Sequence, residues 1–137
     1  MQLPTPDEHN NVSLSKFESM LKTNNILFFD SNQFEEIINH YLENGKIALA
    51  KKATKLGLQQ HPSSTTLKLF QVEMFIFENE LEIAEELLEN IYLLEQFNEE
   101  VFIQKANILS RRDKHLEAIK MLEKAHNLST EPSDVLS

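Results

Sequence analysis

Residues 31–64 read SNQFEEIINHYLENGKIALAKKATKLGLQQHPSS, and this stretch decides the fold. Each half carries apolar residues at helical spacing. They are Phe34, Ile37, Ile38 and Tyr41 in the first half and Ile47, Leu49, Ala50 and Ala53 in the second. Gly45, between the halves, suits the left-handed conformation that ends many helices. Pro62 ends the second half because it disfavours helical geometry at the preceding residue. The stretch predicts two antiparallel helices joined by a tight turn.

The same pattern returns along the chain at an interval of 34 residues, as Ala50, Ala84 and Ala118 show. When the repeats are aligned, three other columns of equivalent positions each hold residues of one kind. They are bulky apolar residues (Tyr41, Phe75, Leu109), further apolar residues (Ile38, Val72, Ala106) and turn formers (Gly45, Asn79, Asp113). A fourth column, with Gly57, Ile91 and Ala125, is small in two of its three members. Small residues are expected there because the second helix of a pair approaches a neighbouring helix closely.

The recurrence predicts three repeats, at 31–64, 65–98 and 99–132. Their helices are predicted at 31–44, 47–60, 65–78, 81–95, 99–111 and 115–128. Residues 1–12 are polar and are predicted to form a loose leader. Residues 13–30 are predicted to hold one amphipathic helix and its connection, and 133–137 resemble the start of a truncated further repeat.

Together, these features resemble the tetratricopeptide repeat family. The first repeat matches its signature columns best, with Phe34, Ile37, Tyr41, Gly45, Ala50 and Pro62. The third follows with Phe102, Ala106, Leu109, Ala118, Leu122 and Ala125, whereas the second departs at Lys68 and Gln71. The resemblance implies an all-α fold: a right-handed α-α superhelix, or solenoid, of about three helix-turn-helix repeats preceded by an extra N-terminal helix.

In this family the first helix of each pair lines a concave groove that binds another protein or peptide. The resemblance implies that the groove residues are Asn32, Glu35, Asn39, Leu42, Leu69, Glu73, Ile76, Glu100, Ile103 and Asn107. This acidic and aliphatic set favours a basic or amphipathic segment, with apolar anchors on Leu69 and Ile76. Some members clamp a C-terminal carboxylate with Lys, Asn and Arg. Of the clamp positions only Asn39 matches, since the others hold Glu35, Phe70, Glu100 and Gln104.

The helix predicted at 65–78 is apolar nearly all round, which indicates burial on more than one side. One interpretation is ordinary core, covered by the adjacent repeats and the N-terminal helix. The other is an apolar groove for a peptide.

Composition narrows the classes of function. The formal charge of −9 disfavours nucleic acid and anionic membranes as partners. The chain has no cysteine, and its first residues show no signal peptide, which fits a cytoplasmic protein.

The sequence contains no pattern of residues typical of an active site. We therefore expect that the chain is not an enzyme and has no cofactor and no metal site. The five histidines are scattered without metal-ligand spacing. Adjacent acidic residues such as Glu85 and Glu86 point in different directions on a helix. The basic residues Arg111, Arg112 and Lys114 fit the end of a helix better than an anion site.

The expected function is therefore an interaction module or scaffold. The last helix pair has apolar residues but no cap helix after it; these residues are Ile119, Leu122, Ala125 and Leu128. Either the chain is a fragment of a longer array, or this edge pairs with a second copy to give a homodimer. A regulatory region of a larger protein is a further alternative.

Overall fold

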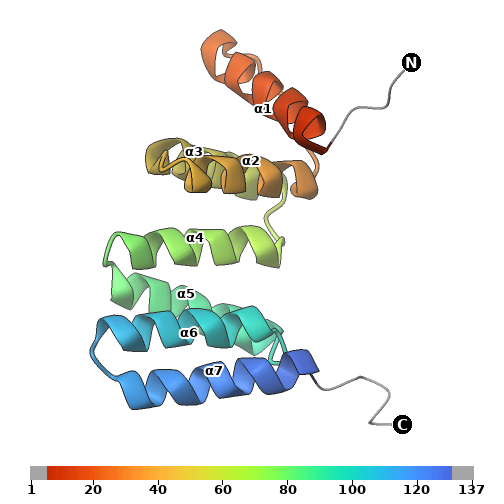
Figure 1. The fold of residues 1–137 in the computed structure, drawn as a ribbon. Helices are drawn as coiled ribbons and strands as arrows, with labels where there is room; N and C mark the ends of the chain where they lie inside the picture. Colours follow the sequence, from red (N-terminus) through yellow and green to blue (C-terminus); the bar gives the residue numbers. More distant parts are fainter. Residues whose placement is uncertain (1–5, 131–137) are drawn as a thin grey trace, which may run out of the picture. The chain divides into compact units, whose positions relative to one another are not determined.

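The computed structural model describes residues 6–130, and within that range every regular element is an α-helix. Figure 1 labels the helices in chain order. Their bounds are α1 Pro6–Thr23, α2 Ser31–Glu43, α3 Ile47–Gln60, α4 Thr65–Phe77, α5 Leu81–Leu94, α6 Glu99–Arg111 and α7 His115–Thr130. The predicted all-α class is confirmed, and the six predicted repeat helices are found within two residues of their expected bounds.

The N-terminal helix differs from its prediction, because α1 begins at Pro6 and includes residues that we expected in a loose leader. The expectation rested on the scarcity of large apolar residues in 1–12. However, proline suits the first position of a helix, where its missing N–H would have no partner anyway. The leader prediction is therefore wrong for 6–12. Residues 1–5, and the predicted repeat start at 133–137, lie outside the described residues.

The turn inside each predicted repeat has the same backbone geometry. Gly45, Asn79 and Asp113 all adopt the left-handed conformation, with φ of 69°, 62° and 61°. In each turn the N–H one residue later donates to a carbonyl five residues back. These bonds run from Lys46 to Tyr41, from Glu80 to Phe75 and from Lys114 to Leu109, at 2.8, 2.8 and 2.9 Å. This geometry provides hydrogen-bond donors for carbonyls that would otherwise have none at the end of the helix. The recurrence in the sequence is thus also a recurrence in backbone structure.

The chain divides into two compact units, 1–67 and 68–137. The core of the first unit is aromatic. Phe17 of α1 packs against Phe29, Phe34 and Tyr41, with ring centroids 6.1 to 6.4 Å apart. Phe29 and Phe34 are closer still, at 5.5 Å in an edge-to-face arrangement. Such pairs add roughly 0.5–1.5 kcal/mol each to the area that they bury. The N-terminal helix is therefore part of this core.

Gly57 lets α3 approach this aromatic core. A Cβ atom at its position would lie 3.1 Å from Phe34 Cγ and 3.1 Å from Leu67 Cδ1. These distances are shorter than ordinary van der Waals contact. The small residue predicted in this column is therefore explained by close packing.

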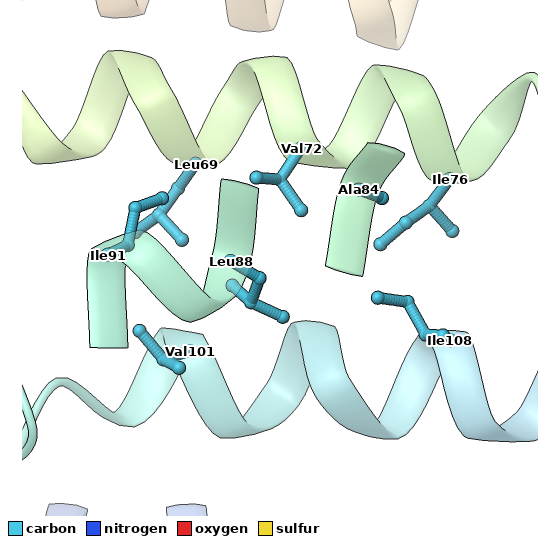
Figure 2. Packing of buried hydrophobic residues seen from close by; sticks show 8 residues of the cluster. All are labelled: Leu69, Val72, Ile76, Ala84, Leu88, Ile91, Val101 and Ile108. Carbon is cyan, nitrogen blue, oxygen red and sulfur yellow. The ribbon is translucent and has the colours of Figure 1, made fainter. Parts of the chain in front are cut away.

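The core of the second unit is aliphatic and lies between α4, α5 and α6. Figure 2 shows Leu69, Val72 and Ile76 pointing from α4 toward α5 and α6. The remaining members of the cluster are Ala84, Leu88 and Ile91 of α5 and Val101 and Ile108 of α6. Helix α7 packs along α6 and buries Ala118 and Ala125. The near-continuous apolar surface of α4 is thus used largely as core.

Candidate binding surface

The acidic surface of the second unit centres on two carboxylates, Glu73 of α4 and Glu100 of α6. Glu73 is an exposed residue and Glu100 is half-buried. The pKa of the Glu73 carboxyl is raised, first because neighbouring atoms remove water from it and second because Glu100 is negatively charged. Raised pKa values of this kind indicate a site where negative charge is poorly compensated. A cation at this position would offset the repulsion between the two carboxylates.

Three side chains along α6 form a hydrogen-bonded row. Gln104 Nε2 donates to Glu100 Oε1 at 3.0 Å, and Asn107 Nδ2 donates to Gln104 Oε1 at 3.3 Å. Gln104 is only 4% exposed, so these bonds satisfy a buried amide. Asn98 caps the helix by accepting from the Glu100 N–H at 3.0 Å. The row holds the Glu100 carboxylate in one orientation and leaves Asn107 exposed.

Two residues predicted as apolar anchors do not lie on the surface. Leu69 is 7% exposed and Ile76 is 5% exposed, and both belong to the core cluster of the second unit (Figure 2). They face α5 and α6, which cover the apolar excess of α4. This corrects the predicted groove, since neither side chain is available to a partner. Ile103 of α6, in contrast, remains half-buried and offers some apolar surface.

The predicted residues of the first unit form a separate stripe along α2. Asn32 and Asn39 are exposed, and Glu35 and Leu42 are half-buried. Their spacing of three or four residues places them on one helix face. The pKa of the Glu35 carboxyl is raised, mainly by burial and further by the charges of Asp30 and Glu36. These four residues, the α2 stripe, therefore resemble the acidic surface of the second unit. Both have a carboxylate with a raised pKa next to amide and aliphatic side chains.

One of the basic residues at the end of α6, Arg112, has a structural role. Arg112 is the C-cap residue of α6, and its Nη1 lies 2.7 Å from Glu85 Oε2 of α5. The interpretation of this cluster as a helix end therefore fits the geometry. Among residues 6–130 no group of three or more His, Asp or Glu side chains is placed to hold a metal ion.

The loop between α1 and α2 carries exposed apolar residues that the sequence analysis did not single out. Ile26 is 73% exposed and Phe28 is 84% exposed. The loop is nevertheless fixed, because the Gln60 amide donates to Leu27 O at 2.9 Å and accepts from Phe29 N at 3.1 Å. His61 Nε2 lies 2.7 Å from Phe29 O. In the sequence, the apolar run from Ile26 to Phe29 indicates that this loop holds apolar side chains, but it gives no indication of which of them are exposed.

None of the helices in the described part of the chain is both long and apolar enough to cross a membrane. No protein family model matches the chain, and no curated protein is significantly similar to it.

Proposed function

We propose that this chain is a protein interaction module of the tetratricopeptide repeat type, arranged as a right-handed solenoid. The recurrence of turn geometry at Gly45, Asn79 and Asp113 supports this architecture. So does the burial of Ala50, Ala84 and Ala118, since the family has a small residue early in each second helix. Proteins of this kind present the first helix of each pair to a partner. As a binding module in the cytoplasm, it would act without catalysis, cofactor or metal.

The partner that we propose is a basic or amphipathic segment of another protein. One observation carries this choice: Glu73 and Glu100 lie close enough that the charge of one raises the pKa of the other. A Lys or Arg side chain would compensate both carboxylates, and exposed Asn107 would donate or accept a hydrogen bond beside them. Apolar contact would come from Ile103 in the same unit. The α2 stripe of the first unit, with Asn32, Glu35, Asn39 and Leu42, would be a separate surface of similar character.

The test is a binding titration with two synthetic peptides. The first is a labelled amphipathic peptide of alternating Leu and Lys pairs, and the second carries Glu in place of every Lys. We expect the basic peptide to bind and the acidic one not to bind. Replacing Glu73→Gln and Glu100→Gln together should weaken the basic peptide roughly five-fold, because each exposed ion pair contributes about 0.2–1 kcal/mol.

A matched control separates local contact from net charge. Glu82→Gln with Glu86→Gln changes the charge by the same amount at exposed positions on α5. This pair should leave the affinity within experimental error. Equal losses in the two double variants would show that only the overall charge of −9 attracts the peptide, and the proposed surface would be rejected.

A second candidate function is self-association through α7. Leu116, Ile119 and Leu122 lie on one face of this helix and are 79%, 51% and 48% exposed. A second copy could bury such a face. Sedimentation over a hundred-fold range of concentration would then show a rising mass, and Ile119→Lys would hold the protein monomeric. A constant monomer mass in the unaltered protein would exclude this function.

A further inference from the structure

A cavity of about 320 Å³ lies between the α5–α6 turn and the C-terminal half of α7. Its volume is at the lower end of the range found for ligand pockets. The cavity is open to solvent on one side. Its lining residues are Tyr92, Gln96, Phe97, Phe102, Lys124, Asn127 and Leu128. All of them belong to the second unit, and none is a residue of the acidic surface described above.

The apolar part of this cavity is built around an aromatic pair. Tyr92 and Phe102 pack edge to face, with ring centroids 5.9 Å apart and planes at 82°. Phe102 is 8% exposed, so it forms a fixed floor. Phe97, in the α5–α6 turn, is 82% exposed and stands at the edge. Leu128 of α7 completes the apolar lining and is half-buried. The cavity is a shallow hollow that can hold one apolar side chain of moderate size against its aromatic floor.

One lysine of the lining, Lys124, gives this cavity a positive charge, and a second, Lys105, lies against Tyr92 outside the lining. Lys105 Nζ lies 4.2 Å from the centroid of Tyr92, and Lys124 Nζ lies 5.9 Å from the centroid of Phe102. Both distances are in the range of cation–π contact. Lys105 is also 3.8 Å from the Glu89 carboxylate, which compensates its charge. Among the side chains that the structure describes, Lys124 has no carboxylate at salt-bridge distance.

The lining also contains two exposed amides, Gln96 and Asn127, which can donate hydrogen bonds to a carboxylate. Apolar rings, an ammonium group with no carboxylate partner among residues 6–130, and amide donors thus surround a single cavity. This combination is the opposite of the acidic surface on α4 and α6. It fits an anionic ligand with an apolar body.

We propose that this cavity binds a partner protein through an aromatic or large aliphatic side chain that stands next to a carboxylate. The side chain would pack on Phe102 between Phe97 and Leu128, and the carboxylate would pair with Lys124. Charge complementarity selects this occupant over a basic one, since a cation would face Lys124. The site is independent of the acidic surface and of the function proposed for it.

Two small probes test this site in the full chain: N-acetyl-phenylalanine, which carries a carboxylate, and N-acetyl-phenylalanine amide, which is neutral. Both are titrated into the isotope-labelled protein and followed by NMR. We expect saturable shifts of the Phe97, Phe102 and Leu128 amide resonances. The carboxylate probe should bind roughly three-fold more tightly, as an exposed ion pair allows. Shifts confined to other regions, or equal affinity for both probes, would overturn the proposal.

Three variants at exposed positions separate the contributions. Lys124→Met should abolish the preference for the carboxylate probe while keeping the apolar binding. Lys120→Met removes the same charge from α7 outside the cavity and should leave the preference intact. Phe97→Ser should weaken both probes. If Lys120→Met abolishes the preference as well, the discrimination comes from general charge, and the assignment to Lys124 is wrong. Far-UV circular dichroism checks that each variant is folded.

Discussion

Replacing Gly57→Ala tests the packing on which the first unit depends. Gly57 lies in the interior of α3, where alanine is normally favoured over glycine by about 1 kcal/mol. At this position the added Cβ would lie 3.1 Å from Phe34 Cγ, 3.3 Å from Phe34 Cδ1 and 3.1 Å from Leu67 Cδ1. The two effects have opposite signs. The outcome depends on whether these neighbours can move.

The surroundings of Phe34 indicate that it cannot move without cost. Its side chain is fully buried, and its ring packs against Phe17, Phe29 and His61 at centroid distances of 5.5 to 6.4 Å. Leu67 is fully buried as well. Overpacking of a well-filled core costs roughly 1–3 kcal/mol. After subtracting the helix-propensity gain, we expect Gly57→Ala to destabilise the protein by about 1 kcal/mol.

The assay is urea unfolding followed by far-UV circular dichroism, with the midpoint compared at constant slope. Lys55, exposed on the same helix, supplies the reference. The difference between Lys55→Ala and Lys55→Gly measures the propensity gain in α3 without any packing change. The double variant Phe34→Leu with Gly57→Ala then tests the cause. If the clash is with the Phe34 ring, the alanine should cost less in the leucine background, with a coupling energy of about 1 kcal/mol.

A stability gain in Gly57→Ala equal to the gain measured at Lys55 would refute the reasoning. It would show that Phe34 and Leu67 yield to the new methyl group at no cost. The small-residue column would then have no packing basis in this repeat.

Three further predictions follow from hydrogen bonds and charges. Burial, with a smaller effect from Glu18, raises the pKa of Tyr41 to about 12. The stability that this neutral tyrosine contributes is therefore present below pH 10 and is lost as the pH rises from 10 to 12. In Tyr41→Phe, the free energy of unfolding measured at each pH should fall less across this window. Gln60→Ala removes both hydrogen bonds to the α1–α2 loop. It should speed hydrogen exchange at the Phe29 amide and lower the free energy of unfolding by about 1–2 kcal/mol. The neighbouring variant Gln59→Ala should have neither effect. The raised pKa of Glu73 means that its ionised form destabilises the fold at neutral pH. Glu73→Gln should therefore raise the melting temperature at pH 7, and this gain should vanish at a pH below the ordinary Glu value of 4.5. An equal gain at both pH values would contradict the charge explanation.

The helices and turns could be predicted from the sequence because their signals are local. Each turn former stands at the position that needs a left-handed backbone, so one residue of a type that tolerates this conformation marks each turn. Asn79 and Asp113 do without a glycine there, which short polar side chains allow. The scarcity of large apolar residues in 1–12 gives no indication that α1 begins at Pro6, whereas a proline is favoured at the first position of a helix.

The exposure of particular side chains could not be predicted as well, because it depends on neighbours distant in sequence. Helical spacing places Leu69 and Glu73 on the same broad face of α4, but only the packing of α5 and α6 determines that Leu69 is buried and Glu73 exposed. The positioning of Phe28 likewise depends on Gln60, more than thirty residues later, which holds the loop on either side of it. No local pattern contains that information.

The aromatic rings of the cavity come from two consecutive helices, Tyr92 from α5 and Phe102 from α6. Tyr92 reaches Phe102 of the next helix, and the two rings together attract Lys105 and Lys124. Aromatic rings can hold a cation without neutralising it, whereas a carboxylate neutralises it. Lys124 therefore keeps its positive charge beside these rings, and this distinguishes the cavity from the α2 stripe and from the acidic surface on α4 and α6.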